Sequence, residues 1–527
     1  MSMQRIAQVA AFAVATSVAL PSFAAATTNE GGEYTYTGSP NDNRTTGQTG
    51  DQIWNVQNPI SMGNFWPGQN DVVPYWQIYR GAAITASGNC RVMKGNVVFE
   101  NAVKWTGTEN LIGLIGPTKL VLRNGGSLTT TTEHLRIGQL HNDYPTSTAT
   151  LFMEEPSLLS VNVGNAIAGN TRPGAIWMDG GTLAVSNGVF KTGGTASQDG
   201  YIRINGGVVS LGAGNAEFFS IGSAANYGSL HISGGTVSSR RTTVASDPYA
   251  RLGVGSSKAA DIYVDGGLFD LWNERLDIGY WNSSGVSGSR ATLTVDGDGR
   301  VVMYLPIMGR SGSGNKATVN LNGGRLELTR CFATYSNTGN NRGVNFDGGT
   351  LALVKHPKTT DVNGMVDSAA GEIVVYPKGG SISVQSGITG GISTSCRTAT
   401  GYGVSEITLT NPGSGYVTAP EVKITGGSGS GATAYAVLNK DRTLEKIVVT
   451  CRGEGYAVGD SVTVTISSAT GSGAAATATL ASNAGGVLRK TGDGALRLTA
   501  DNAYDGEFEV AAGAFAGSSR LFVRRSA

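Results

Sequence analysis

The stretch VDGGLFDLWNERLDIG, residues 264–279, contains an Asp-Gly-Gly turn with apolar residues at alternating positions on both sides. Such alternation predicts strands with one buried face, so the stretch indicates two short strands flanking the turn. Glycine permits positive φ, and the preceding Asp265 accepts hydrogen bonds within the turn. Taken alone, the pattern is also the strongest short-range signal of a β-hairpin. Its recurrence along the chain distinguishes a hairpin from a repeated coil.

The same turn recurs about every 28 residues, with Asn or Ser replacing Asp in some copies. Its first glycines are Gly180, Gly206, Gly234, Gly266, Gly323 and Gly348, and a variant turn places Gly297 between Gly266 and Gly323. A later Ile-Gly or Met-Gly pair indicates a third short strand, at Ile137-Gly138, Ile221-Gly222, Ile278-Gly279 and Met308-Gly309. With imperfect copies near Gly125 and Glu155, about nine units lie between Leu120 and Val354.

Near-constant spacing and repeated inward positions favour stacked units over isolated hairpins. A unit with three short strands fits one coil of a parallel β-helix, whose coils stack about 4.8 Å apart around an apolar column. We therefore predict an all-β, single-stranded parallel β-helix, or solenoid, over residues 119–400. An antiparallel meander, a sandwich or a propeller is the alternative.

The composition agrees with an all-β protein. Glycine supplies 78 of the 527 residues, and charged residues make up only 15%. The glycine share is about twice the usual one of roughly 7%. Abundant Gly, Thr, Ser, Val and Ala suit short strands and tight turns and give helices little support. The net charge of +1, without a basic stripe, argues against nucleic acid or an anionic membrane as a partner.

Residues 1–26 have the pattern of a secretory signal peptide. A basic start at Arg5 precedes an apolar stretch from Ile6 to Leu20, and small residues favour cleavage after Ala24 or Ala26. An uncleaved membrane anchor is the alternative, although the stretch is shorter than the roughly 20 residues that a span needs. No later segment is apolar enough to cross a bilayer, so we expect a protein that is secreted or attached to the outer cell surface.

Residues 27–118 lack the glycine turn and are rich in aromatic residues, including four of the seven tryptophans: Trp54, Trp66, Trp76 and Trp105. A stacked β-helix needs its open end covered, and bulky non-repeating residues would serve that purpose. We predict an N-terminal cap here. The alternative is an aromatic platform that binds sugars.

Residues 401–482 form a tandem β module with its own period. Tyr416 in Gly-Ser-Gly-Tyr matches Tyr456 in Gly-Glu-Gly-Tyr, 40 residues later. The module resembles glycine- and tyrosine-marked repeats of bacterial surface proteins and phage tail proteins. Both tyrosines are candidate surface contacts, but the favoured interpretation is that they are buried rings that cover a glycine turn.

Residues 483–527 carry a third pattern, which includes Lys490-Thr491-Gly492, Gly494, Leu496, Leu498, Asn502, Tyr504, Gly506, Val510, Gly513 and Phe515. It resembles the autotransporter-associated β-strand repeat, also called the passenger-associated transport repeat. The resemblance implies a right-handed β-helix exported by a Gram-negative-type bacterium and displayed or released. An autotransporter would continue into a C-terminal translocator barrel, which this sequence does not include. Either another system exports the chain, or it is the truncated passenger of a longer autotransporter.

Catalytic and metal-binding patterns are weak. Adjacent carboxylates such as Glu154-Glu155 point to opposite faces of a strand, and Asp296 occupies a turn position already explained by backbone bonding. The histidines have no triad or metal spacing, and no nucleophile elbow or phosphate loop is present. We assign no catalytic, cofactor or metal site and expect that the protein is not an enzyme. Cys396 and Cys451 are the candidate disulfide pair, with free buried thiols as the alternative.

The sequence thus predicts a structural or adhesive extracellular rod that makes multivalent contacts with glycans, cell-surface components or itself. The rival is a β-helix polysaccharide lyase or glycoside hydrolase, which would need carboxylates and a basic residue converging from adjacent coils in a lateral groove. Trp272, Glu274 and Arg275 are required by no neighbouring unit. We therefore predict an outward-facing contact there.

Overall fold

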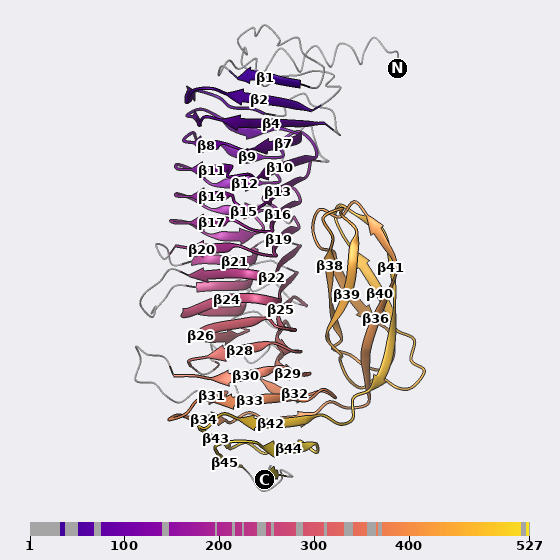
Figure 1. Ribbon diagram of the computed structural model, residues 1–527. Helices are drawn as coiled ribbons and strands as arrows, with labels where there is room; N and C mark the ends of the chain where they lie inside the picture. The colour runs from indigo at the N-terminus through magenta and orange to yellow at the C-terminus, as the bar shows by residue number, and fades with distance from the viewer. Residues whose placement is uncertain are drawn as a thin grey trace.

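A computed structural model shows a long rod of stacked strands with a second, smaller body beside it (Figure 1). Among the residues that the structure describes there is no helix, which confirms the all-β prediction. The described residues are 32–36, 51–67, 75–139, 147–194, 198–212, 217–223, 226–239, 249–254, 258–280, 288–309, 314–330, 332, 341–355, 365–366, 371–517 and 523–525. The predicted signal peptide, residues 1–26, lies outside them.

The rod is a parallel β-helix with three faces, because each strand pairs in parallel with the strand one coil away. Face A contains β1 (Gly32–Tyr36), β2 (Gln52–Val56), β4 (Trp76–Gly81), β7 (Gly95–Phe99), β10 (Thr118–Leu122), β13 (Ala149–Met153), β16 (Gly174–Met178), β19 (Gly200–Ile204), the starts of β22 (Tyr227–Ser239) and β24 (Ala259–Tyr280), β25 (Arg290–Val295), β27 (Lys316–Leu321), β29 (Asn341–Phe346), β32 (Glu372–Val375) and β35 (Cys396–Thr398).

The other two faces follow the same scheme. Face B contains β3 (Ile60–Met62), β5 (Ile84–Ala86), β8 (Ala102–Trp105), β11 (Ser127–Thr130), β14 (Leu158–Val161), β17 (Thr182–Val185), β20 (Val208–Leu211), parts of β22 and β24, the start of β26 (Arg300–Met308), β28 (Arg325–Leu328), β30 (Thr350–Leu353), β33 (Gly380–Val384), β42 (Val487–Thr491), β44 (Glu507–Val510) and β46 (Val523–Arg525). Face C contains β6 (Cys90–Val92), β9 (Asn110–Ile112), β12 (Leu135–Ile137), β15 (Ala166–Ala168), β18 (Phe190–Thr192), β21 (Glu217–Ser223), β23 (Tyr249–Val254) and the ends of β24 and β26. A separate four-stranded sheet contains β31 (Met365–Val366), β34 (Thr389–Ile392), β43 (Ala495–Leu498) and β45 (Ala514–Ala516).

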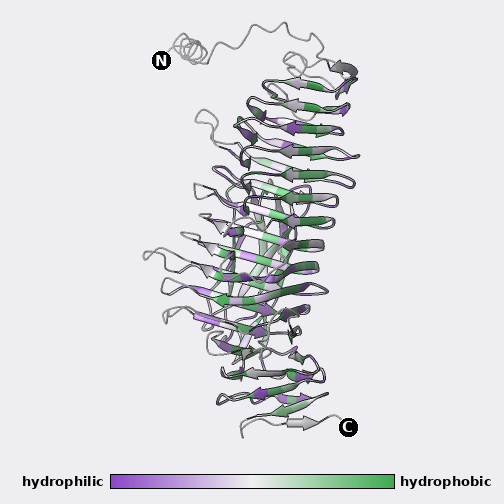
Figure 2. Ribbon diagram, turned by 90° about the vertical axis from the view of Figure 1, so that its left-hand side faces the viewer, coloured by the Kyte–Doolittle hydropathy of each residue, from purple (hydrophilic) through white to green (hydrophobic). Residues whose placement is uncertain are grey.

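The stretch 264–279 is most of one coil and not a hairpin, since β24 passes through all three faces. Val264 pairs with Ile232 of the preceding coil on face A, and Phe269 pairs with Val237 on face B. Ile278 pairs with Leu252 on face C. Val264, Phe269, Leu271 and Ile278 all point into one continuous apolar core, as predicted. Figure 2 shows the resulting alternation of hydrophobic and hydrophilic residues along the coils.

The glycine pairs form the corners between faces A and B. Gly267 has a φ of +65°, and a Cβ built on it would lie 2.5 Å from the carbonyl oxygen of Gly235 in the preceding coil. The pair is therefore needed both for the left-handed backbone conformation and for backbone-to-backbone stacking of the corners. Nine face A strands, β10 to β29, lie in the region of the predicted repeats, which confirms about nine units.

The described part of residues 27–118 is not a separate cap, so that prediction is wrong. Strands β1, β2, β4 and β7 pair in register as further coils of the same rod. Their large rings fill the interior: Trp54 and Tyr79 are buried and stack with ring centroids 6.5 Å apart. Trp105 is buried as well, which argues against a sugar-binding platform built from these rings. The interior of these coils is filled by large aromatic side chains, and their corners lack the Gly-Gly pair. The glycine pattern in the sequence therefore does not reveal them.

The C-terminal repeat also stacks on the rod, because β42 pairs directly with β33. Its characteristic side chains form hydrogen bonds with backbone groups of neighbouring coils. The buried Lys490 amine donates to the carbonyl of Ala512 at 2.8 Å, and the hydroxyl of Tyr504 accepts from the backbone N–H of Leu488 at 3.1 Å. The carbonyl of the Asn502 side chain accepts from the backbone N–H of Cys396 at 3.0 Å. These residues therefore hold the last coils together.

The tandem module is inserted between β35 and β42 and lies alongside face A (Figure 1). Its strands are β36 (Tyr402–Ser414), β37 (Glu421–Thr425), β38 (Thr433–Leu438), β39 (Leu444–Cys451), β40 (Thr463–Ser467) and β41 (Ser472–Ser482). They pair antiparallel as β36 with β41, β37 with β40 and β38 with β39. The first strand of one repeat thus pairs with the last strand of the other, which gives the two repeats an approximate two-fold relation.

Face A and the module share one apolar cluster, in which Trp177 and Tyr201 of the rod pack with module residues such as Leu438 and Ile447. Polar contacts surround it. Arg203 donates to the carbonyl of Leu438 at 2.5 Å. The Asn322 side chain donates to the carbonyl of Thr450 at 2.9 Å. The module therefore covers a rod face whose outward side chains are built for burial.

His231 lies buried in this interface and makes its stability depend on pH. Its Nε2 is 2.8 Å from Asp265 Oδ1, and its ring packs on Tyr263 and Tyr435. Burial lowers the pKa of His231 below the ordinary 6.5, although Asp265 opposes the shift. The folded state then binds fewer protons than the unfolded state, so stability falls as pH drops below about 6.5. Urea unfolding at several pH values should show this loss, and His231→Gln should remove it. An equal loss in both proteins would contradict this account.

Candidate functional site

Tyr416 and Tyr456 are not the candidate surface contacts of the module, and instead cover glycine turns, the interpretation that the sequence favoured. Tyr416 and Tyr456 are only 2% and 4% exposed. A Cβ built on Gly471 would lie 2.3 Å from the Tyr416 ring, and one built on Gly429 would lie 2.4 Å from the Tyr456 ring. Each tyrosine covers a glycine of the other repeat, so both act in folding and neither is a surface contact.

Of the three residues predicted to make an outward-facing contact, Glu274 and Arg275 do not face outward, and the contact at Trp272 stays a prediction. Glu274 is fully buried, and its carboxylate accepts from the Ser239 hydroxyl at 2.8 Å. Arg275 lies 3.0 Å from Asp277 and is largely covered. Both side chains sit at the corner between faces B and C, where they bond to other side chains instead of facing solvent. Trp272 is half-buried and lines a groove.

The predicted disulfide does not form, because Cys396 and Cys451 are both free buried thiols. Cys396 belongs to the rod core, whereas Cys451 lies in a small cluster between rod and module. The Cys451 sulfur is 3.4 Å from the Tyr376 hydroxyl. Burial raises the pKa of the Cys396 thiol to about 12.

The groove beside Trp272 has a volume of about 470 Å³ and runs across successive coils of the rod. It is lined by Trp272, Arg300, Arg325, Glu327, Val354, Lys355, Ser383, Val384, Gln385, Ser386, Gly492 and Asp493. These residues come from or directly follow β24, β26, β28, β30, β33 and β42, which stack on face B. Five steps of about 4.8 Å make the groove roughly 24 Å long, parallel to the rod axis.

A charged network forms the centre of the groove. Arg300 binds Glu327 through two contacts, of 3.0 and 2.9 Å, and Arg325 donates to the same carboxylate at 2.8 Å. Burial would raise the pKa of Glu327, but the hydrogen bonds from both arginines outweigh it and lower the pKa. The carboxylate is therefore ionised and held in place. Both guanidinium groups keep exposed edges for further hydrogen bonds.

Sequence comparison of the repeats could have found this network. Arg300 and Arg325 directly follow the glycine corner in successive units and pair in register. Because alternate residues of a strand share one face, Glu327 must lie on the same outward side as Arg325. The polar residues near the lower end, Gln385 and Asp493, come from different segments of the chain and carry no such signal. Gln385 accepts from the backbone N–H of Lys355 at 2.8 Å.

An aromatic side chain next to fixed hydrogen-bonding groups suits a ligand with both apolar and hydroxylated faces. Within the described ranges, no cluster of three or more His, Cys, Asp or Glu side chains could hold a metal ion. The search for membrane-spanning helices in those ranges likewise found none long and apolar enough.

The fold and site define a parallel β-helix with an inserted β module and a lateral groove. Comparison with known protein families, with curated proteins and with solved structures finds no match for this chain.

Proposed function

We propose that the chain is an exported adhesive rod that binds a linear glycan lengthwise in the lateral groove. The observation that carries the proposal is the placement of Trp272 beside the Arg300–Glu327–Arg325 network. The indole ring can stack on the apolar face of a sugar ring, while the fixed guanidinium edges donate to its hydroxyl groups. The groove runs across successive coils, parallel to the rod axis. The spacing between coils is close to the length of one sugar ring, so successive sugar rings would contact successive coils.

Export to the outer surface of a Gram-negative-type bacterium fits this role. It is supported by the signal pattern of residues 1–26 and by the resemblance of residues 483–527 to the autotransporter-associated repeat. A long groove on a rod can bind one polymer through several weak contacts, whose combined affinity exceeds that of each contact alone. Cell-surface glycans and a neighbouring rod bearing glycans are both partners of this kind.

A glycan array probed with the purified chain tests the proposal. Linear oligosaccharides should bind, and their affinity should rise with length until the ligand spans the groove. Trp272→Ala should weaken binding at least about tenfold, because stacking with one ring is lost. Trp76→Ala removes another half-buried tryptophan, in β4 of the rod, and should leave binding unchanged. Melting curves of both variants show whether the rod remains folded.

Failure of every linear glycan to bind would refute the proposal, as would equal binding by the Trp272 and Trp76 variants.

A second candidate is glycan cleavage in the same groove, since Glu327 and Asp493 lie there with Lys355. Glycosidases need one carboxyl group that stays protonated to act as an acid. The two arginines keep Glu327 ionised, which disfavours it for that task. A reducing-end assay on the bound glycan separates the two functions. Release of sugar ends that Glu327→Gln abolishes would favour the enzyme, whereas pure binding predicts no release.

A further inference from the structure

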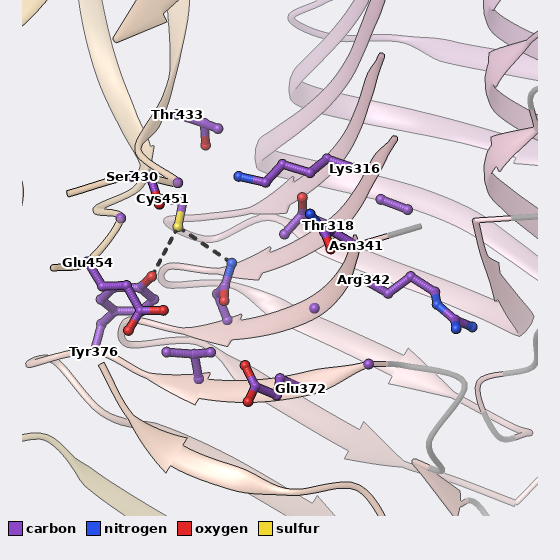
Figure 3. A pocket seen from close by; sticks show the side chains of 17 residues that line it. Lys316, Thr318, Asn341, Arg342, Glu372, Tyr376, Ser430, Thr433, Cys451 and Glu454 are labelled. Carbon is purple, nitrogen blue, oxygen red and sulfur yellow. Dashed lines mark hydrogen bonds between the residues drawn. The ribbon is translucent and has the colours of Figure 1, made fainter. Parts of the chain in front are cut away.

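A second cleft lies at the seam between the inserted module and face A of the rod, whereas the Trp272 groove lies on face B. It has a volume of about 440 Å³, within the range typical of small-molecule sites. The rod contributes residues of β27, β29 and β32, and the module contributes residues next to β38 and β39. Figure 3 shows the side chains that face the cleft. Its chemistry is independent of the Trp272 groove.

Glycine keeps the rod wall of the cleft open. Gly343 of β29 lies in register between Thr318 of β27 and Glu372 of β32. A Cβ built on Gly343 would come no closer than 3.6 Å to any neighbour, and its φ lies outside the left-handed region. Neither packing nor backbone conformation therefore demands glycine here. The missing side chain leaves space at the rod wall, whereas Gly431 and Gly453 on the module side are already explained by their positive φ of +87° and +66°.

Lys316 and Arg342 line the cleft together with Glu372 and Glu454, and with Arg397, which bonds both carboxylates, these five side chains carry a net charge of +1. Glu372 and Glu454 both bind Arg397, at 3.0 and 2.6 Å, so their charges are already engaged. The Lys316 amine has no hydrogen-bond or ion-pair partner within the part of the chain that the structure describes. Its side chain extends toward Ser430 and Cys451 across the opening (Figure 3). A single ammonium group beside engaged carboxylates favours a ligand with one negative charge.

The remaining polar groups suit a hydroxylated ligand. Thr318, Asn341 and Thr433 line the cleft and offer hydroxyl and amide groups. The Thr433 hydroxyl is held by the Thr450 hydroxyl at 2.8 Å, which fixes its position. A phosphate would bring about two negative charges, more than the net charge of +1 balances. A carboxylate brings one.

We propose that this seam cleft binds the carboxylate of an acidic sugar unit, with Lys316 as its counter-ion and Gly343 as the space for its ring. The module and the rod both contribute walls, so a bound sugar would also bridge them. The ligand class follows from the charge and the hydroxyl groups of the cleft and does not depend on what the Trp272 groove binds.

Calorimetric titration of the purified full chain with trigalacturonate at low salt tests the proposal. A neutral galactose trisaccharide and a sulfated one are the comparison ligands. Trigalacturonate should bind, added salt should weaken it, and the neutral trisaccharide should not bind. Lys316→Met should weaken binding at least about tenfold, because a hydrogen bond to a charged group is lost. Gly343→Val should abolish binding by filling the space, with little change in melting temperature.

Two controls separate this site from the rest of the molecule. Lys104→Met removes an exposed lysine of β8 on face B and should not change the affinity. Trp272→Ala should also leave it unchanged, so failure of the groove and failure of the cleft are distinguishable. The proposal is overturned by absent binding, by equal binding of the neutral trisaccharide, by binding of the sulfated trisaccharide alone, or by Lys316→Met and Gly343→Val variants that bind like the parent chain.

Discussion

Gly267→Ala is expected to destabilise the rod by about 2–5 kcal/mol, an unusually large effect for adding one methyl group. A non-glycine residue in the left-handed conformation costs about 1–2 kcal/mol. The new Cβ would also lie 2.5 Å from the carbonyl oxygen of Gly235, and overpacking of this kind costs about 1–3 kcal/mol. The contacting atoms are backbone, so no side chain can rotate away. The two coils must separate locally.

Gly125→Ala is the matched control. Gly125 has a φ of +83° at a corner of the same kind, yet a Cβ there would meet nothing within 4 Å. Only the conformational cost of about 1–2 kcal/mol applies. Urea unfolding of both variants measures the difference directly. Equal losses would contradict the close backbone stacking of the Gly235 and Gly267 corners.

The corner residues explain why the repeat could be detected in the sequence. Asp, Asn and Ser alternate before the glycines, and the structure joins them into a ladder. The Asn205 side chain donates to Asp179 at 2.7 Å, and Ser233 donates to Asn205 at 2.6 Å. Each coil thus needs a small polar side chain and a compact turn at one place. A local requirement repeated in every coil gives a periodic pattern, which sequence alone can detect.

Docking of the module was not predicted, although a signal for it exists. Strand β16, GAIWM, is buried along its whole length, with Ile176 facing the core and Trp177 facing the module. A strand buried on both faces is apolar without alternation. The sequence therefore indicated that something covers face A. It carried no information on which segment does so, because the covering residues lie more than 200 positions away in the chain.

Of the residues that line the groove, the sequence singled out only Trp272. Glu274 and Arg275 also depart from the repeat, but residues that depart from a repeat can stabilise a corner of the coil as well as bind a ligand. The corner of β24 buries the Glu274 carboxylate against Ser239. Exposure at a corner depends on the length and path of neighbouring loops, and periodicity does not encode these. Distinguishing the three residues required the coordinates.

Arg290→Met is expected to destabilise the folded chain by about 3–5 kcal/mol, the cost of leaving a buried partner charge alone. Arg290 binds the carboxylate of Asp261 through both terminal nitrogens, one of them at 3.0 Å. Asp261 is 4% exposed and also accepts from the Tyr227 hydroxyl at 2.7 Å. Burial would lower the pKa of Arg290, but Asp261 outweighs it and raises the pKa, so the guanidinium stays charged.

The double variant Asp261→Asn, Arg290→Met should recover most of this loss, since no buried charge remains. Arg489→Met is the control for an ordinary ion pair. Its partner Glu509 lies 2.5 Å away, but the Arg489 side chain is 54% exposed, so a loss below about 1 kcal/mol is expected. Denaturant unfolding of the parent chain, the single variants Asp261→Asn and Arg290→Met and the double variant measures the coupling, and Arg489→Met is measured alongside. If Arg290→Met costs no more than Arg489→Met, the face under the module is open to water and the pair does not help to hold the module on the rod.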